Sequence, residues 1–152
     1  ADEAFYAEAA REMVDSGDWI TPTYNFEPRF QKPVLYYWLT AATYRVTGPT
    51  EWAARLWAAL SGLGLVLLTA YCARRWYDDG VALLAGAIVA TSFGYYSIGR
   101  MALPDLPLTF FITAAICAAL VAMLDQPRQQ TRWVVAAAVA LALGFLTKGP
   151  VG

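Results

Sequence analysis

The sequence predicts an all-α protein that crosses a membrane several times, as a polytopic helical bundle with an amphipathic loop ahead of it. Its composition is 59% hydrophobic and 15% charged, with a mean hydropathy of +0.42. A soluble domain is nearer about 45–50% apolar and about 25% charged. Four long apolar segments follow residue 51, whereas residues 2–38 are both charged and aromatic. That mixture is typical of the membrane–water boundary.

Residues 3–15 predict a short amphipathic helix at this boundary. Apolar residues recur at four-residue intervals from Phe5 to Met13, and acidic residues occupy the opposite face. These acidic residues are Glu8, Glu12 and Asp15. Asp2 is suited to cap the first turn, and Gly17 is suited to end the helix. The segment is too short and too charged to span a bilayer.

The part that follows predicts an ordered loop and then a second interfacial helix. Three prolines and an asparagine interrupt regular structure between residues 18 and 33. A helical segment follows at about 34–44, before a Gly-Pro step ends it. We therefore expect residues 2–50 to form a loop domain with two interfacial helices, and residues 51–152 to form the membrane domain.

Four membrane helices are expected in the second domain, at about 52–75, 80–99, 105–124 and 131–147. Their uncharged runs contain 18, 20, 19 and 15 residues in chain order, and about 20 helical residues cross a hydrocarbon core of about 30 Å. The fourth run is short, but Thr131 and Trp133 extend it at one end and the Lys148 ammonium reaches water at the other. A soluble bundle is the alternative, and its helices would carry a polar face that these runs lack.

Arginines mark one set of connections between the spans. Arg74-Arg75 lies between the first two spans, and Arg128 and Arg132 lie between the last two. The positive-inside rule makes these connections cytoplasmic, so that the other helix ends face outward. Three charged elements then converge outside the cytoplasm: the 2–51 segment, the Arg100–Asp105 turn and Lys148.

Lys32 and the turn from Arg100 to Asp105 are the main candidates for chemistry on that side. An ammonium group among aromatic residues suits a phosphate, and the alternative for Lys32 is an interfacial lysine that only reaches water. Arg100 and Asp105 flank a tight connection, and ionisable groups at membrane depth are functional candidates because their burial is costly. The alternative is a structural Arg–Asp pair or a helix cap. Asp2 and Glu3 are likewise either capping residues or a general base.

Several other classes of site are disfavoured. A net charge of −1 provides no basic face for nucleic acid. The chain has no phosphate-binding glycine loop and no nucleotide-binding strand pattern, which argues against a nucleotide-sugar donor. Cys72 and Cys117 lie in apolar runs and the chain contains no histidine, so that neither a disulfide framework nor a zinc site is indicated.

Short motifs occur in order along essentially the whole chain. They are Asp2–Glu8, Arg11–Met13, Gly17–Trp19, Phe30–Pro33, Leu35–Trp38, Ala54–Leu56, Gly99-Arg100, Pro104-Asp105 and Thr147–Pro150. Together they resemble the N-terminal part of bacterial GT-C glycosyltransferases of the aminoarabinose-transferase-like and protein-mannosyltransferase-like group. The chain also lacks an initiator Met, and we interpret it as a fragment of a larger protein.

The resemblance implies a multi-pass enzyme of the bacterial inner membrane whose active site faces outside the cytoplasm. Such an enzyme transfers a sugar with inversion from a dolichyl- or polyprenyl-phosphate donor to a lipid A-like lipid, a glycan or a protein. By the resemblance, Asp2 and Asp105 are the catalytic acids, and the donor phosphate meets Lys32, Arg100 and Lys148. It also implies substrate binding by Glu3, Tyr6, Gln31 and Tyr37. Sugar transfer needs a carboxylate that takes the proton of the acceptor, and it needs cations that stabilise the departing phosphate. The charged residues of the outward face include both.

The chain departs from the family pattern at two positions. Phe5 stands where the family often has Arg, and Gln31 stands where it commonly has Glu. Since that Glu is a metal ligand in some relatives, Gln31 and the absence of histidine argue against a divalent metal, and no other cofactor is expected.

Two other functions are alternatives to sugar transfer. A membrane transporter or flippase of a lipid-linked or anionic substrate also places charges near membrane-embedded turns. The large amphipathic loop and the lack of paired broken helices in repeated halves disfavour it. The third class is a purely structural membrane subunit.

Overall fold

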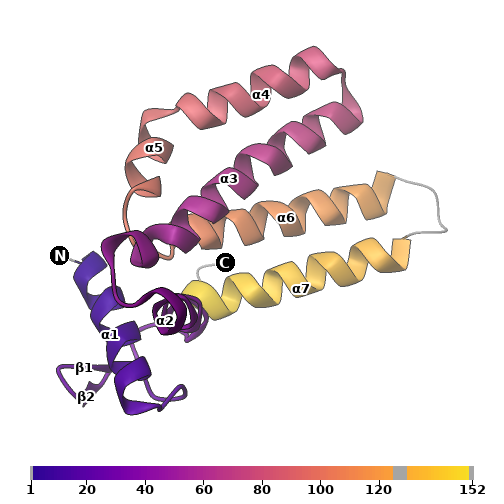
Figure 1. The fold of residues 1–152 in the computed structure, drawn as a ribbon. Coiled ribbons are helices and arrows are strands. Elements are labelled where there is room, and N and C mark those ends of the chain that lie inside the picture. The colour runs from indigo at the N-terminus through magenta and orange to yellow at the C-terminus, as the bar shows by residue number, and fades with distance from the viewer. Residues whose placement is uncertain (1, 125–129, 151–152) are drawn as a thin grey trace.

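The computed structural model describes residues 2–124 and 130–150, which form long helices with a small helical layer at one end (Figure 1). The layer consists of α1 (Asp2–Ser16) and α2 (Leu35–Thr47). The long helices are α3 (Glu51–Trp76), α4 (Asp79–Thr91), α6 (Asp105–Leu124) and α7 (Gln130–Lys148), and the short α5 (Phe93–Gly99) continues α4. The predicted all-α architecture is confirmed, with one short hairpin as the exception.

The helices α1 and α2 pack together through small and aromatic side chains, at the positions where two helices were predicted. Gly17 and Gly48 end them with φ of 72° and 79°, a conformation that glycine adopts without steric cost. The buried cluster contains Ala9, Ala10, Met13, Tyr37, Ala41, Tyr44, Ala53, Ala54 and Ala102. Because Ala102 lies in the turn before α6, this cluster joins the layer to the bundle.

The loop between α1 and α2 contains a hairpin that the sequence analysis did not predict. Its strands are β1 (Thr23–Tyr24) and β2 (Glu27–Pro28). Glu12, which the sequence places on the acidic face of the helix, is only 3% exposed. Its carboxylate accepts hydrogen bonds from the Thr23 hydroxyl and from the Phe26 N–H. The hairpin covers Glu12 and replaces the hydrogen bonds that water would otherwise give it.

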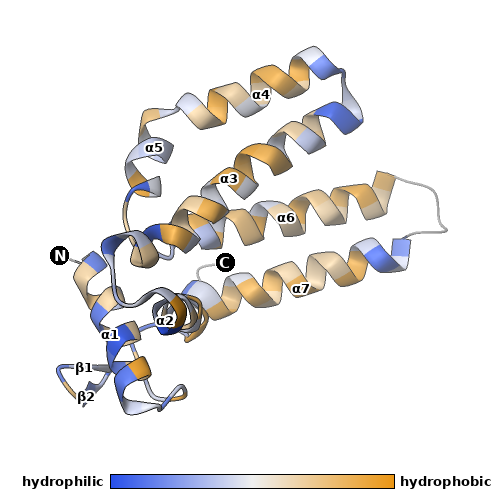
Figure 2. Cartoon of the chain, in the orientation of Figure 1, coloured by the Kyte–Doolittle hydropathy of each residue, from blue (hydrophilic) through white to orange (hydrophobic). Residues whose placement is uncertain are grey.

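Three predicted spans form helices long and apolar enough to cross a membrane: α3, α6 and α7. The helix α6 packs against both α3 and α7, and α3 also packs against α4. Apolar colour runs along these helices, whereas hydrophilic colour gathers on α1 and at the helix ends remote from it (Figure 2). Arg74 and Arg75 are in the last turn of α3, and Arg132 is in the first turn of α7. Arg128 lies outside the described residues.

The predicted single span at 80–99 is wrong in shape. It divides into α4 and α5, which meet at an angle of 60°. Ser92 between them has extended backbone angles, φ −70° and ψ 130°. Its N–H and its hydroxyl both donate to the Val89 carbonyl, at 3.3 and 3.1 Å. The Ser92 hydroxyl thus bonds a backbone carbonyl of the preceding turn, and this local hydrogen bond accompanies the bend between α4 and α5.

Gly64 on α3 allows a close approach of α6, because a Cβ atom there would lie 2.8 Å from Cε2 of Phe110. Gly64→Ala should therefore overpack this contact, destabilise the fold by about 1–3 kcal/mol and lower the thermal unfolding midpoint of the full-length protein. Gly94→Ala on α5 is the matched control, since a Cβ there would meet nothing within 4 Å. Equal midpoints for the two variants would contradict this account of the α3–α6 contact.

Candidate active site

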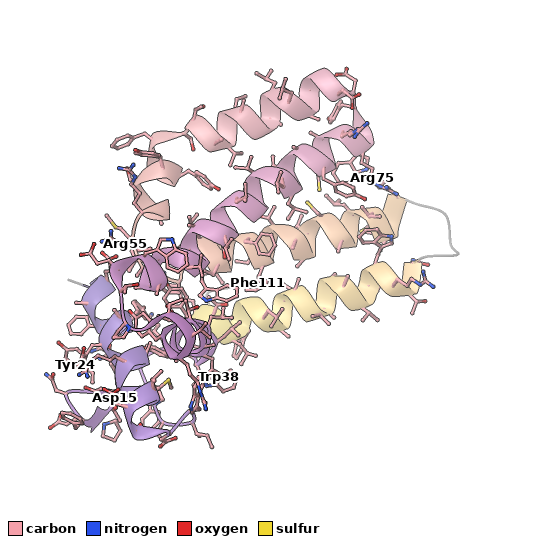
Figure 3. All side chains as sticks on the ribbon, viewed as in Figure 1. Asp15, Tyr24, Trp38, Arg55, Arg75 and Phe111 are labelled. Carbon is pink, nitrogen blue, oxygen red and sulfur yellow. The ribbon has the colours of Figure 1, made fainter. Side chains whose placement is uncertain are left out.

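The charged elements that were predicted to converge do so at the α1–α2 end of the bundle. Arg55 and Arg75 lie at opposite ends of α3, and Arg55 lies beside α1 (Figure 3). Glu3 contacts the turn between α5 and α6, 99 residues away in sequence, and Asp105 contacts Lys148, 43 residues away. The helices α3 and α6 leave this end and α4–α5 and α7 return to it, which brings the segments together (Figure 1).

Lys32 and Lys148 line one cavity of about 400 Å³, here called the lysine cavity. Lys32 belongs to the loop before α2, and Lys148 is the last residue of α7. The apolar part of the wall consists of Ile20, Pro22, Phe30, Pro33, Val34, Phe145 and Pro150. Two ammonium groups beside apolar walls suit a phosphate that carries an apolar chain.

Asp105 begins α6 and orients Lys148. Its Oδ1 accepts a hydrogen bond from Nζ of Lys148 at 2.5 Å, and the lysine side chain is 23% exposed. The partner of Asp105 in the described part of the chain is therefore Lys148. The alternative of a structural pair between Arg100 and Asp105 is not observed there. The Asp105–Lys148 pair fixes one ammonium group at the edge of the lysine cavity.

A second cavity of about 100 Å³, here called the aromatic pocket, gathers four of the predicted site residues. Its lining consists of Phe5, Tyr6, Arg29, Gln31, Lys32 and Tyr37. The guanidinium of Arg29 lies 4.3 Å from the centroid of the Phe5 ring and donates to Oε1 of Gln31 at 2.9 Å. Burial raises the pKa of Tyr37, so that its hydroxyl stays protonated. Gln31 and Lys32 line both cavities, which makes this pair of neighbours the link between them.

Glu3 joins three elements of the site. Its Oε1 accepts one hydrogen bond from Nε of Arg55 on α3, at 2.7 Å, and another from the N–H of Ala102, at 3.0 Å. The Arg55 guanidinium holds the pKa of Glu3 below its ordinary value. Glu3 is therefore ionised at neutral pH.

Among the residues predicted for catalysis and for the donor phosphate, Arg100 lies apart from the lysine cavity and Asp2 has no described side chain. The guanidinium of Arg100 lies 4.4 Å from the centroid of the Tyr96 ring, beside a separate cavity of about 260 Å³. Asp2 is the first residue of α1, but its side chain lies outside the described part of the chain. The predicted approach of Asp2 to Asp105 therefore stays a prediction, although the adjacent Glu3 contacts the turn that leads to Asp105.

The side-chain oxygen of Gln31 is engaged by a neighbouring cation. The Oε1 atom of Gln31 already accepts a hydrogen bond from Arg29, and a neutral amide is a poorer partner for a divalent cation than a carboxylate. Within residues 2–124 and 130–150, no three His, Cys, Asp or Glu side chains gather at metal-ligand distance.

Arg29 and Arg55 are the site residues that the sequence analysis missed. Both had a signal, since Arg29 lies in the aromatic loop and Arg55 lies in one of the family motifs. Their partners, Phe5 and Glu3, belong to α1 and are distant in sequence. Only the packing of α1 against its following loop and against α3 identifies these contacts.

Comparison with known proteins connects this geometry to a family. The sequence profile described as dolichyl-phosphate-mannose-protein mannosyltransferase matches residues 2–152. An undecaprenyl phosphate-alpha-4-amino-4-deoxy-L-arabinose arabinosyl transferase 2 from Sodalis glossinidius is 36% identical over 152 residues, covering 97% of this chain and 27% of that protein. An uncharacterized protein from Aquifex aeolicus is 36% identical over 151 residues, covering 99% of this chain and 30% of that protein. The chain thus spans less than a third of the length of these relatives.

The same similarity extends to solved structures. The crystal structure of ArnT from Cupriavidus metallidurans bound to undecaprenyl phosphate matches with a TM-score of 0.94 and 33% identity, over 99% of this chain and 28% of that chain. Its apo state matches with a TM-score of 0.93 and 32% identity, over 98% of this chain and 28% of that chain. These matches confirm the predicted polytopic GT-C bundle and the resemblance carried by the motifs. The chain therefore belongs to the dolichyl-phosphate-mannose-protein mannosyltransferase family.

Proposed function

We propose that this chain is part of a glycosyltransferase that moves a sugar from a polyprenyl phosphate to an acceptor outside the cytoplasm, with inversion. The observation that carries the proposal is the lysine cavity, which combines two ammonium groups with apolar walls. A polyprenyl-phosphate sugar has a matching phosphate and hydrocarbon chain. The Sodalis relative is named for an undecaprenyl-phosphate-linked aminosugar, and the Cupriavidus protein was solved with undecaprenyl phosphate.

Lys32 and Lys148 bind the donor phosphate in this mechanism. As the bond between the anomeric carbon and the phosphate oxygen breaks, the electron pair remains on the phosphate, and the ammonium groups stabilise its growing charge. Asp105 holds Lys148 in place through the hydrogen bond to Nζ. The products are the glycosylated acceptor and the polyprenyl phosphate.

Asp2 is the proposed general base. Its carboxylate takes the proton of the acceptor hydroxyl while the acceptor oxygen attacks the anomeric carbon from the face opposite the phosphate, so that the configuration inverts. Tyr6, Gln31 and Tyr37 of the aromatic pocket supply polar groups for the sugar beside Lys32. The position of Arg100 beside a separate cavity does not support the phosphate contact that the resemblance implied.

A transfer assay on the full-length protein tests the function. The protein is reconstituted with a radiolabelled polyprenyl-phosphate sugar and a membrane extract that contains lipid, glycan and protein acceptors, and we expect label in an acceptor together with free polyprenyl phosphate. Movement of the intact lipid-linked sugar across the bilayer without transfer would instead indicate a flippase.

The site is proposed to face outside the cytoplasm of a bacterial inner membrane, since Arg74, Arg75 and Arg132 lie at the other end of the bundle. In a variant that lacks Cys72 and Cys117, we expect Arg75→Cys to react with an impermeant maleimide only from the cytoplasmic side. Met101→Cys, at a 44% exposed residue of the site end, should react only from outside. The opposite pattern would reverse the topology.

Lys32→Ala should weaken donor binding on the order of ten- to hundred-fold, because a hydrogen bond to a charged group contributes about 1.5–3 kcal/mol. Lys32→Arg should retain more affinity, since a guanidinium also meets a phosphate. Titration of the full-length protein with polyprenyl phosphate measures both. Arg45→Ala removes an exposed cation of α2 and is the control. Unchanged affinity in Lys32→Ala would leave Lys32 as an interfacial lysine.

Asp2→Asn should reduce turnover by roughly 10²–10⁴-fold with little loss of donor binding, because a general base acts on the chemical step. Asp105→Asn should lower both turnover and the affinity for the donor, since Lys148 loses its ionic partner. Turnover and polyprenyl-phosphate affinity are measured for each full-length variant. Normal turnover in Asp2→Asn would make Asp2 a helix cap and remove it from the mechanism.

A further inference from the structure

The turn that delivers Asp105 to the site is packed through Ala102 and Pro104, which are both buried, but its internal hydrogen bonds do not reach another element. It follows α5, which departs from the direction of α4 by 60°. Within the turn, the N–H of Met101 donates to the Ile98 carbonyl at 3.0 Å and the N–H of Leu103 donates to the Met101 carbonyl at 2.8 Å. These bonds close the turn on itself, but they do not attach it to another element.

The polar attachment of the turn comes from Glu3 on α1, in addition to the packing of Ala102 in the buried cluster. Ala102 is 1% exposed, and its N–H donates to Oε1 of Glu3 at 3.0 Å. A buried backbone donor needs a partner, and here the partner is a side chain from a distant part of the chain. The bond therefore fixes the middle of the turn to the surface of α1.

Arg55 in turn orients Glu3. Its Nε donates to the same Oε1 atom at 2.7 Å, and its Nη1 lies 3.5 Å from Glu51 on the preceding turn of α3. Glu8 and Arg11 of α1 also face this region, since both line the 510 Å³ cavity that Glu3, Glu51 and Arg55 share. Glu8 is paired with Arg11, so that Arg55 is the cation that engages Glu3.

We propose that Glu3 and Arg55 form a positioning bridge that sets the place of Asp105 relative to α1 and to the lysine cavity. Asp105 follows Ala102 by three residues, and Pro104 restricts the backbone between them. The bridge reaches the donor through Asp105 and Lys148, and this role rests on the proposed function. Glu3 then acts on the turn and not by contact with the substrate, which replaces the substrate-binding role that the resemblance implied.

Amide hydrogen exchange of the full-length protein tests the bridge without an activity assay. Glu3→Ala and Arg55→Ala should speed exchange in peptides that contain Ala102 by at least ten-fold, while peptides from the middle of α6 stay unchanged. Glu3→Gln keeps an oxygen acceptor for the Ala102 N–H and should show a smaller increase. Glu27→Gln and Arg45→Ala, at exposed positions, are the matched controls. Unchanged exchange at Ala102 in all three bridge variants would overturn the bridge.

Kinetics separate positioning from a general loss of structure. A misplacement of about 1 Å can lower turnover by up to about 10²-fold. We therefore expect Glu3→Ala and Arg55→Ala each to lower kcat ten- to hundred-fold. The rise in the donor KM should be smaller than in Asp105→Asn, because the bridge variants displace the partner of Lys148 without removing it. Arg55→Lys should recover part of the loss. The double variant should be no worse than Glu3→Ala, because both residues act through one contact.

The exchange experiment and the kinetic experiment together distinguish a failure of the bridge from a failure of the proposed function. Additive losses of kcat in the double variant, or a donor KM raised as much as in Asp105→Asn with kcat unchanged, would contradict the positioning role while leaving sugar transfer intact. If the unmodified protein transfers no sugar, the proposed function and the catalytic purpose of the bridge fail together, and the exchange data still decide whether the bridge holds the turn.

Discussion

The cost of placing charge in hydrocarbon is the constraint on which this structure depends. The predicted spans carry uncharged runs of up to 20 residues, so that carboxylates, ammonium groups and guanidinium groups concentrate at the helix ends (Figure 2). Each short connection sends the chain back across the bundle, and segments that are far apart in sequence meet at the same end. The Asp105–Lys148 pair and the bond from Ala102 to Glu3 both follow from this return.

The α1–α2 layer converts that end of the bundle into a site with distinct compartments. Its loop carries Lys32 to the end of α7, which forms the lysine cavity, and it also places Arg29 against Phe5 in the aromatic pocket. The burial of Glu12 under the hairpin holds the start of this loop against α1. The lysine cavity, the aromatic pocket and the contact that holds the turn before α6 are therefore built from one short segment that lies on the helix ends.

The different fates of the acidic residues show why contacts were harder to predict than topology. Glu3, Glu12 and Asp105 all look alike in sequence, as acids at or near helix starts or on a polar face. In the structure, Glu3 meets Arg55 and Ala102, Glu12 meets the hairpin, and Asp105 meets Lys148. Each partner lies on another element, and helical periodicity describes only the element that carries the acid.

By itself, the sequence determined the all-α class, the positions of α1, α2, α3, α6 and α7 and the convergence of the charged segments, because the length of apolar runs and the cost of charge in hydrocarbon act residue by residue. Its motifs also identified the family. The tertiary structure alone decided the 60° bend at Ser92, the burial of Glu12 and the separation of Arg100 from Lys32 and Lys148. These features depend on which surfaces pack against one another, and a hydrogen bond between distant segments leaves no periodic trace in either of them.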